Sequence, residues 1–262
     1  MLPAAVGLAV ALPLLADESR SQGGADFGRS AHHDASASLV PGPVEPAFAP
    51  GKPTALRRSA DVSRWAVVRS SAAARARPRR HARVVGRIPT HTPEGTSNIV
   101  LVLGSSSDRT GALWIHVRLA ALGQPRTGWV RRSALGGYGT VATHLVVDLH
   151  SLRATLFRNG RAIFRADVGV GKPAWPTPSG EFYIRNKLTD FASPMYGPVA
   201  FGTSARSSVL TDWPAGGYVG IHGTDEPALI PGRVSHGCIR MQNADILRLA
   251  KLMPVGTPLT VR

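Results

Sequence analysis

The sequence predicts a mainly β protein with two folded parts, a small N-terminal β-barrel and a larger C-terminal β domain with one clear helix. Three observations predict this fold class. From about residue 62, short runs rich in Val, Ile and Trp alternate with turn residues. An Asn-Gly pair near residue 160 separates two such runs, which is typical of a tight hairpin. Helical periodicity is clear only once, close to the C-terminus.

The N-terminal quarter of the chain predicts export followed by a linker. Residues 1–16 contain the uncharged apolar run LPAAVGLAVALPLLA, which is too short to span a bilayer and has the length of a signal-peptide core. Residues 17–60 are rich in Ala, Gly, Pro and Ser without a sustained apolar period, which predicts a disordered linker. We therefore expect an extracytoplasmic protein that is secreted, periplasmic or cell-wall associated, with residues 1–16 acting as a cleaved signal peptide or as a membrane anchor.

Residues 62–135 predict the small barrel. Its expected strands lie in the runs WAVVR, ARVVGRI, NIVLVL, LWIHVRL and TGWVRR, a number and spacing typical of small barrels. A strand, a basic turn and then the segments W-I-x-V and T-G-W-V resemble a bacterial SH3-like domain, and the resemblance implies a wall-binding or spacing module. We expect Trp114 and Trp129 to pack in the barrel core and not to form a ligand platform, because aromatic strand residues usually pack.

Positive charge is concentrated in the middle of the chain. The chain contains 31 Lys and Arg and 16 Asp and Glu residues, and residues 51–140 hold 16 of the basic and 3 of the acidic ones. This excess is either a compositional bias of an arginine-rich sequence or a sign of an anionic partner, such as a wall polymer or lipid head groups. Nucleic acid is disfavoured as a partner, because no recognition motif with interleaved aromatic residues accompanies the charge.

Residues 140–262 predict the larger β domain. Residues 144–171 contain three consecutive strands, with Asn159 and Gly160 at the hairpin turn. A Pro- and Gly-rich loop then precedes a strand at 182–184, and the final segment TPLTVR forms the last strand.

The single helix of this domain has recognisable ends. Asn243 is its predicted N-cap and Pro254 ends it. Its predicted apolar face consists of Ile246, Leu247, Leu249, Ala250 and Met253. Between the strands and this helix, the Gly-, Pro- and Ser-rich segment 192–218 is expected to be a long loop that forms a flap over the functional site.

The chain has one cysteine, Cys238, within the segment RVSHGCIRMQ. Exported proteins commonly use cysteines in even-numbered disulfide sets, so a single one indicates intermolecular pairing or a reactive thiol. A buried cysteine can also act as a small hydrophobic residue, but Ser235, His236, Gly237 and Arg240 are unusual surroundings for an inert core position. We interpret Cys238 as a nucleophile.

Two histidines are candidates for the base that such a thiol requires. A thiol of pKa about 8.5 is mostly protonated at neutral pH and needs an imidazole or amide dipoles to become a thiolate. His236 lies two positions before Cys238, and residues i and i+2 of an extended segment point to the same side. His222 lies 16 residues before Cys238, a separation that a loop can close. The residues alone do not choose between them.

A zinc site is the alternative for the same side chains. His222, His236 and Cys238 are all possible zinc ligands. Their spacing matches no standard zinc signature, and the sequence offers only Asp212 and Asp225 as further candidates, so we expect neither a metal nor another cofactor.

Several segments of the C-terminal half occur together in one known family. They are VVDL, LFRNGRAIFRADVGVGKP, PTPSGEFYI, GIHG and SHGCIRM, in this order, and SHGC-x-R with the upstream HG is the specific part. This set resembles the catalytic domain of the L,D-transpeptidases, cysteine acyltransferases that cross-link bacterial peptidoglycan. The resemblance implies a β-sandwich fold, peptidoglycan stem peptides as substrates, an extracytoplasmic setting and inhibition by carbapenem β-lactams.

The resemblance also assigns roles to residues. It implies that Cys238 is the nucleophile and His222 the base, that the carbonyl of Gly223 holds the other ring nitrogen of this base, and that His236 has a supporting role.

Around the nucleophile, the backbone amides of Gly237 and Cys238 are candidate donors of an oxyanion hole. Ser235 belongs to the same supporting segment. Arg240 either binds a substrate carboxylate or braces the loop, because a bidentate guanidinium serves both purposes.

The implied reaction is an acyl transfer. Cys238 attacks the carbonyl on the L-side of a terminal D-residue in a stem peptide, releases D-Ala and forms a thioester, which the amine of a neighbouring stem resolves. If water instead of an amine attacked the thioester, the chain would be an L,D-carboxypeptidase. A non-catalytic wall-binding protein is a further alternative, and the complete set of site residues argues against it.

Overall fold

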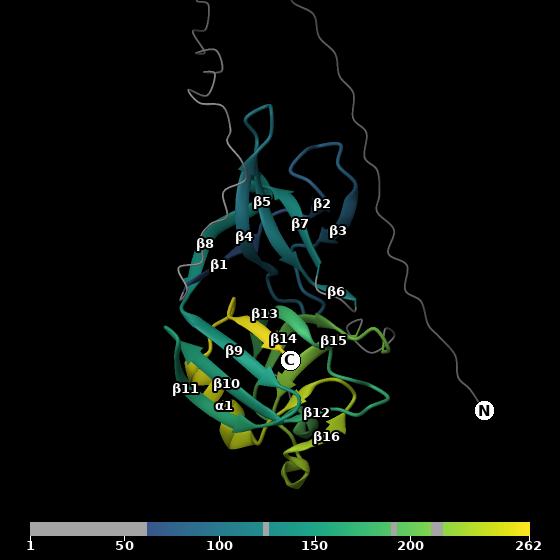
Figure 1. Cartoon of the computed structure of the whole chain (residues 1–262), viewed down its shortest axis with the longest axis vertical. Helices are drawn as coiled ribbons and strands as arrows, with labels where there is room; N and C mark the ends of the chain where they lie inside the picture. The colour runs from purple at the N-terminus through teal and green to yellow at the C-terminus, as the bar shows by residue number, and fades with distance from the viewer. Residues whose placement is uncertain (1–61, 123–125, 190–192, 211–216) are drawn as a thin grey trace, which may run out of the picture. The chain divides into compact units, whose positions relative to one another are not determined.

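The computed structural model describes residues 62–122, 126–189, 193–210 and 217–262 (Figure 1). They belong to one compact unit that contains two β-sheets. The predicted signal or anchor at 1–16 and the predicted linker at 17–60 lie outside the described residues. In these described ranges, no helix has the length and apolar character needed to cross a membrane.

The N-terminal sheet has seven strands among the described residues, in the order β3-β2-β7-β5-β4-β1-β8, all paired antiparallel. Each of the five expected runs overlaps one strand, whereas the Ala-rich β2 and the Gly-rich β8 were not expected. The assignment of this sheet to the SH3-like class stays a prediction. The strands are β1 (Ser63–Val68), β2 (Ala72–Arg75), β3 (Val84–Ile88), β4 (Ile99–Ser107), β5 (Leu113–Leu119), β7 (Arg126–Arg131) and β8 (Leu135–Val141), with the 3-10 turn η1 (Arg132–Ala134) before β8.

The two tryptophans of this sheet differ in burial. Trp114 is 2% exposed, and its indole N–H donates a hydrogen bond of 2.9 Å to a carboxylate oxygen of Asp108, so its predicted core position is confirmed. Trp129 is only half-buried and stacks on the ring of His116 with 4.7 Å between the ring centroids. The core prediction is therefore wrong for Trp129, because its strand turns this side chain toward the surface of the sheet.

The C-terminal sheet comprises eleven strands of the described residues, in the order β11-β10-β9-β18-β13-β14-β15-β17-β12-β16, with β6 beside β14. The 3-10 turns η2 (Pro194–Tyr196) and η3 (Pro227–Leu229) and the helix α1 (Asn243–Leu252) connect its strands. The strands are β6 (Ala121–Leu122), β9 (Thr143–Asp148), β10 (Arg153–Arg158), β11 (Arg161–Asp167), β12 (Gly169–Gly171), β13 (Gly180–Leu188), β14 (Ala200–Arg206), β15 (Tyr218–His222), β16 (Gly232–Ser235), β17 (Ile239–Arg240) and β18 (Pro258–Val261).

Most of the expected local structure in this part is confirmed. Asn159 and Gly160 have φ angles of 51° and 74° and turn the chain between β10 and β11, as the Asn-Gly pair predicts. The strand expected at 182–184 lies within β13, and the last segment forms β18.

The helix α1 forms as predicted but begins differently. Its N-cap residue is Gln242, and Asn243 is the first helical residue. The side-chain oxygen of Asn243 accepts a hydrogen bond of 2.9 Å from the amide of Thr224, so the predicted N-cap is wrong because a distant loop uses this side chain. Leu247, assigned to the apolar face, is 43% exposed, whereas Ile246 and Leu249 are fully buried.

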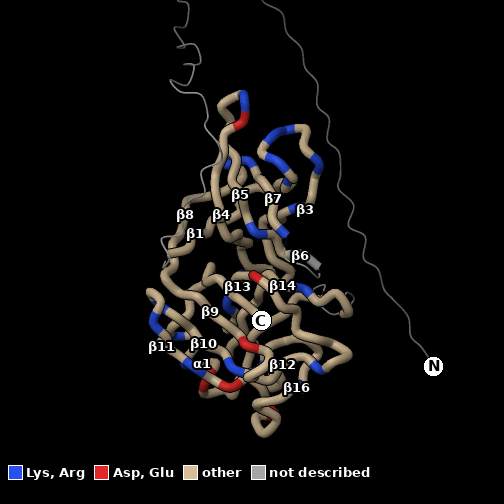
Figure 2. Tube along the Cα trace, in the orientation of Figure 1, with Lys and Arg blue, Asp and Glu red and all other residues tan. Residues whose placement is uncertain are grey.

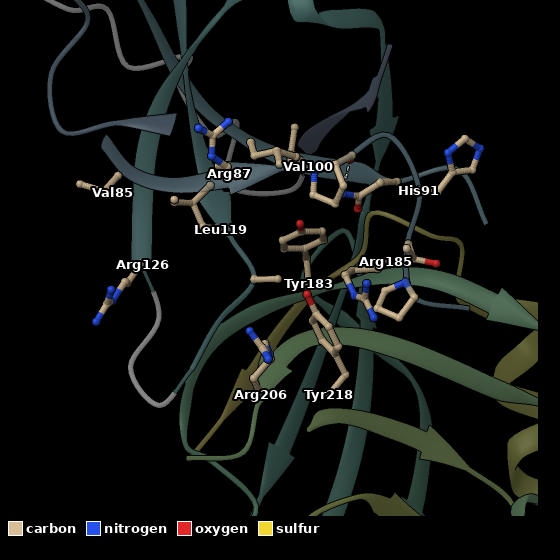
Figure 3. Close-up of a pocket in the computed structure, with 17 residues that line it drawn as sticks. Val85, Arg87, His91, Val100, Leu119, Arg126, Tyr183, Arg185, Arg206 and Tyr218 are labelled. Carbon is tan, nitrogen blue, oxygen red and sulfur yellow. Dashed lines mark hydrogen bonds between the residues drawn. The ribbon is translucent and has the colours of Figure 1, made fainter. Parts of the chain in front are cut away.

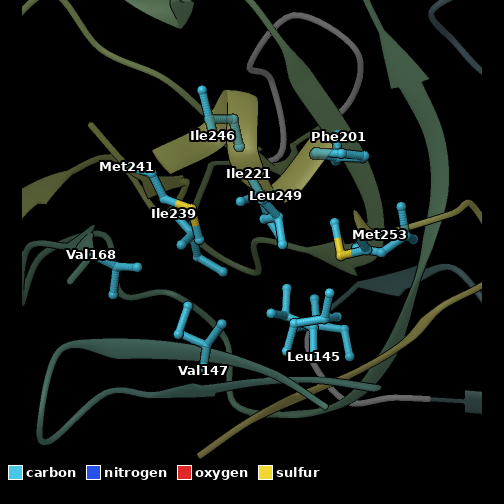
Figure 4. Packing of buried hydrophobic residues seen from close by; sticks show 14 of the residues in the cluster. Leu145, Val147, Val168, Phe201, Ile221, Ile239, Met241, Ile246, Leu249 and Met253 are labelled. Atoms are coloured by element: carbon cyan, nitrogen blue, oxygen red, sulfur yellow. The ribbon is translucent and has the colours of Figure 1, made fainter. Parts of the chain in front are cut away.

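The core of the C-terminal sheet is one continuous apolar cluster (Figure 4). Ile221 from β15 and Ile239 from β17 are completely buried and lie next to Leu249 of α1. Leu145 and Val147 of β9 form the opposite side of the cluster. The two short strands β15 and β17 are thus anchored in the best-packed part of the molecule.

The segment 192–218 is not the single flap loop that its composition predicts. Residues 200–206 form β14, which lies between β13 and β15 in the interior of the sheet, while residues 192 and 211–216 lie outside the described residues. The small residues of β14 allow close packing, since a Cβ atom at Gly202 would overlap the side-chain amide of Asn186. A strand rich in Gly, Ser and Thr was mistaken for a loop.

Polar contacts join the two sheets within the compact unit. The hydroxyl of Tyr183 on β13 donates a hydrogen bond of 3.0 Å to the carbonyl of Ile99 on β4. The guanidinium of Arg185, also on β13, lies 3.1 Å from the carboxylate of Glu94 in the β3–β4 loop, and its side chain is only 2% exposed. The β3–β4 loop and β13 therefore hold each other through a nearly buried ion pair.

Close packing between Trp65 on β1 and Gly256 yields the first prediction. Gly256 has a φ angle of 83°, and a Cβ atom there would overlap the Trp65 ring. We expect Gly256→Ala to lower the free energy of unfolding by about 3 kcal/mol, because left-handed backbone strain and overpacking add. Gly95→Ala is the matched control, since Gly95 has a φ angle of 81° and nothing within 4 Å of its Cβ position.

Urea unfolding of both variants checks this expectation. Gly95→Ala should cost about 1 to 2 kcal/mol, which is the backbone strain alone. Equal losses in the two variants would show that the contact with Trp65 does not limit residue 256.

Candidate active site

Parallel pairing of β15 with β17 sets the position of the site. Ile221 lies opposite Ile239 and His222 opposite Arg240, so Cys238 lies level with Gly220. The amide of Gly220 donates to the sulfur of Cys238 at 3.4 Å. The strand pairing thus holds the segments that contain His222 and Cys238 in a fixed register.

One cavity of about 170 Å³ contains most of the predicted site residues. Its lining includes Ser235, His236, Cys238, Arg240 and His222. The two remaining predicted residues, Gly223 and Gly237, are chain neighbours of this set. The structure therefore brings together the residues that the sequence singled out.

His222 is held in one tautomer by the backbone. Its Nδ1 lies 2.6 Å from the carbonyl oxygen of Gly223, and the side chain is 3% exposed. A carbonyl oxygen can only accept, so Nδ1 carries the hydrogen and Nε2 of the neutral ring keeps a lone pair. Burial lowers the pKa of His222 to about 4; the bond to Gly223 opposes this shift and the charge of Arg240 adds to it. The ring is a neutral base at pH 7.

Cys238 is a protonated thiol in the same surroundings. Burial raises its pKa above the ordinary value of 9.0, while the amide of Gly220 and the positive charge of Arg240 oppose the shift. Both groups of the pair are therefore neutral at rest, and the imidazole does not generate a standing thiolate.

Gly223 is required by packing as well as by its carbonyl. A Cβ atom at this position would overlap the side-chain oxygen of Asn243 and lie 3.0 Å from the backbone of Gly197. Asn243 in turn binds the amide of Thr224 at 2.9 Å. The first turn of α1 thus fixes the loop that carries the acceptor for His222.

The segment before Cys238 is a turn and not an extended strand. The strand β16 ends at Ser235, and Gly237 has a φ angle of 112°. His236 and Cys238 would point to the same side only in an extended segment. Because this segment is a turn, that argument for pairing the two side chains does not apply. The hydroxyl of Thr177, in the loop between β12 and β13, donates a hydrogen bond of 2.8 Å to the carbonyl of Gly237 and stabilises this turn.

The amide of Gly237 has a hydrogen-bond partner within its own turn. It donates at 3.0 Å to the hydroxyl oxygen of Ser235, whose own hydrogen is donated to the carbonyl of Cys238 at 2.6 Å. This bond within the turn competes with the oxyanion role expected for the Gly237 amide, which stays a prediction. Ser235 therefore shapes the turn, and the amide of Cys238 remains as the other candidate donor.

His236 lies at the edge of the cavity. Its side chain is exposed, and its ring packs on Trp175 with 4.3 Å between the centroids at an angle of 39°. This position supports a role in shaping the loop and the substrate pocket rather than that of the buried base.

Arg240 has one of the two contacts between which the sequence did not choose, since it braces a loop. Its Nη1 lies 2.9 Å from the carboxylate of Glu226, and its side chain is 13% exposed. Its Nε is buried without a hydrogen-bond partner among the described residues. One side of the guanidinium thus braces the loop at Glu226, and binding of a substrate carboxylate by Arg240 stays a prediction.

Comparisons with known proteins identify the family. Residues 142–261 match the family model YkuD, described as the L,D-transpeptidase catalytic domain. Over 122 residues the chain is 36% identical to a protein of Bacillus subtilis (strain 168) named L,D-transpeptidase YkuD, covering 47% of this chain and 67% of that protein. The chain belongs to the L,D-transpeptidase family. Its described residues are accordingly mainly β, with the β-sandwich of this family.

Other L,D-transpeptidases are also similar to part of this chain. The B. subtilis protein named YqjB is 37% identical over 101 residues, which cover 34% of this chain and 54% of that protein. A crystal structure of a mutant Enterococcus faecium L,D-transpeptidase is 27% identical with a TM-score of 0.37, covering 46% of this chain and about half (49%) of that one. The E. faecium catalytic domain acylated by ertapenem is 29% identical with a TM-score of 0.35, covering 46% of this chain and 96% of that one. These TM-scores are low, so the family assignment rests on the sequence matches.

The L,D-transpeptidase domain also contains site residues that sequence reasoning missed. Tyr196 of η2 meets the ring of His222 edge-on, with 4.7 Å between the centroids at 70°. Thr177 lies inside the recognised PTPSGEF segment, which was a signal for its role, whereas nothing in the sequence marked Tyr196. Gly220 also escaped notice, although its amide contacts the sulfur of Cys238.

The zinc alternative finds no matching geometry in this L,D-transpeptidase domain. Nδ1 of His222 is committed to the Gly223 carbonyl, and the ring of His236 packs on Trp175. Among the residues that the structure describes, no three His, Cys, Asp or Glu side chains gather closely enough to hold a metal ion.

Proposed function

We propose that this chain is a peptidoglycan L,D-transpeptidase with Cys238 as its nucleophile. The observation that carries the proposal is the alignment of His222 and Cys238 by the parallel strands β15 and β17, in a chain of the L,D-transpeptidase family. A buried neutral base and a protonated thiol next to one cavity are the parts that acyl transfer requires.

The first half-reaction acylates the enzyme. The sulfur of Cys238 attacks the carbonyl on the L-side of the terminal D-residue while Nε2 of His222 takes the thiol proton. The tetrahedral intermediate collapses, the C–N bond breaks, and the leaving amine of D-Ala takes that proton from Nε2. A thioester at Cys238 remains, and His222 is neutral again.

The second half-reaction transfers the acyl group. The amine of a neighbouring stem peptide attacks the thioester, and Nε2 of His222 takes a proton from this nitrogen. The C–S bond breaks and the leaving sulfur recovers the proton from His222. A new amide bond joins the two stems, and the resting neutral pair is restored.

Two further groups assist the reaction in this proposal. The amide of Cys238 donates to the developing oxyanion, where one such donor typically contributes about 3 kcal/mol. The buried Nε of Arg240, which lacks a partner among the described residues, binds a carboxylate of the stem peptide.

The proposal includes the setting of the enzyme. Peptidoglycan lies outside the cytoplasm, so the substrate supports export directed by residues 1–16, with residues 17–60 as a linker. Residues 62–135 would act as an SH3-like wall-binding or spacing domain, and residues 140–262 as the catalytic domain.

Incubation with a disaccharide-tetrapeptide muropeptide tests the function, with mass spectrometry of the products. We expect a cross-linked dimer and free D-Ala from the wild type. Cys238→Ala and Cys238→Ser should lose turnover by at least about 10³-fold while keeping the wild-type melting temperature, because a hydroxyl is far harder to deprotonate than a thiol.

Two other products would contradict the proposal. A shortened stem without a dimer would identify an L,D-carboxypeptidase. An unchanged muropeptide with the folded wild type would indicate a non-catalytic wall-binding protein.

A second prediction concerns carbapenems. A strained β-lactam carbonyl is an electrophile of the same kind as the proposed substrate carbonyl, so Cys238 should open the ring and retain it as a thioester. Ertapenem is a suitable reagent, since the E. faecium relative was acylated by it. Intact-mass spectrometry should show one adduct on the wild type and none on Cys238→Ala. An adduct that persists in Cys238→Ala would place the nucleophile elsewhere.

A further inference from the structure

A second and larger cavity lies apart from the cysteine. It has a volume of about 360 Å³ and is lined by strands β3, β4, β5 and β7 of the N-terminal sheet and by β13, β14 and β15 of the C-terminal sheet (Figure 3). Tyr183 and Tyr218 lie in its centre, with Arg87 above Tyr183 and Arg206 beside Tyr218 in this view. The proposed transpeptidase reaction uses none of these residues.

The lining of this cavity carries one sign of charge. Four arginines line it, Arg87, Arg126, Arg185 and Arg206, and no Asp or Glu is among the described residues that do so. Figure 2 shows the wider excess of Lys and Arg over Asp and Glu on the N-terminal strands. A concave surface of one sign raises the local concentration of oppositely charged ligands.

Two of the four arginines, Arg87 and Arg126, have no carboxylate partner among the described residues, whereas Arg185 has one. Arg185 pairs with Glu94 at 3.1 Å, and its Nε donates to the carbonyl of Thr203 at 2.7 Å. Arg87 and Arg126 are exposed, and no carboxylate pairs with them within the described ranges. The inter-sheet ion pair therefore accounts for the charge of Arg185, whereas no described carboxylate neutralises Arg87 or Arg126.

Stacking on one tyrosine positions part of this charge in advance. The guanidinium carbons of Arg185 and Arg206 lie 3.9 Å and 4.9 Å from the centroid of the Tyr218 ring. A cation–π contact orients a guanidinium without cancelling its positive charge. Preorganised arginines bind phosphate and carboxylate groups more readily than flexible ones do.

Tyr218 connects this cavity with the catalytic one. The same residue lines both cavities, at the start of the strand that ends in His222. A volume of about 360 Å³ exceeds what a single phosphate ion needs and is within the range of pockets that hold larger ligands. An extended polymer can therefore place one segment here and another at Cys238.

We propose that this arginine-lined cavity binds the anionic oxygen groups of a cell-wall polymer, as an exosite beside the catalytic cavity. The choice of a wall polymer rests on the proposed function; the anion chemistry rests on the cavity alone. Phosphodiesters of a polyol-phosphate polymer and carboxylates of peptidoglycan stem peptides offer the same kind of oxyanion.

Binding to the full chain carrying Cys238→Ala tests this site without any turnover. The probes are a fluorescent glycerol-phosphate oligomer and a fluorescent uncross-linked peptidoglycan strand, with affinity measured by anisotropy. At about 0.15 M salt the Debye length is about 8 Å, so distant charges contribute little. We expect Arg87→Glu/Arg126→Glu to weaken binding of at least one probe by about tenfold or more. The probe that is affected identifies the source of the oxyanion.

The matched control is Arg79→Glu/Arg80→Glu, which changes the net charge equally on exposed residues outside the cavity. It should change affinity by less than about twofold. Equal weakening by both double variants would overturn the proposal and indicate diffuse electrostatic attraction. Unchanged affinity in Arg87→Glu/Arg126→Glu would also overturn it, as would a failure of the protein to bind either probe. If the glutamates prevent folding, Arg87→Gln/Arg126→Gln gives the same comparison. The experiment measures binding and not activity, so its result can be interpreted even if the transpeptidase proposal is wrong.

Discussion

The parallel pairing of β15 with β17 is the constraint on which the site depends. Ile221 and Ile239 lie opposite each other and are fully buried, so the core fixes both strands. His222 directly follows Ile221, and Cys238 directly precedes Ile239. A shift of one residue in this register would turn either side chain away from the cavity, because strand side chains alternate between faces. The chemistry therefore depends directly on core packing, although neither reactive residue is part of the apolar cluster.

Burial of the pair has an electrostatic consequence. Removing an imidazole and a thiol from water favours their uncharged forms, and Arg240 disfavours a positive ring further. The carbonyl of Gly223 fixes the hydrogen on Nδ1, so the single lone pair of the base is on Nε2. Such a thiol is less reactive at rest, and in the proposed reaction the charges separate only when the sulfur attacks a substrate carbonyl. The tight fit of Gly223 against Asn243 holds this arrangement without a carboxylate.

The sequence was informative wherever local chemistry decided the structure. The lone Cys238, its neighbouring histidine and the Asn159-Gly160 hairpin could be identified because their signals lie within a few residues. Contacts across the chain were not predictable. The sequence predicts Asn243 as an ordinary N-cap, yet its side-chain oxygen accepts a hydrogen bond from the amide of Thr224. In the same way, the amide of Gly237 donates to the hydroxyl oxygen of Ser235, which the sequence did not indicate. The arginine-lined cavity also required three-dimensional information, because Arg87 and Arg206 come from different sheets.

The central claim is that Cys238 and His222 are both uncharged at rest, with His222 as the base. The rate of Cys238 alkylation by iodoacetamide, measured from about pH 5 to about pH 10, tests it without a substrate. The account predicts a rate that rises with pH to a midpoint above 9.0 without a plateau at neutral pH, since the pKa of the thiol is raised. His150→Ala, at an exposed position, serves as the control for His222→Ala. A plateau below about pH 8 that disappears in His222→Ala but persists in His150→Ala would reveal a standing ion pair and contradict the account.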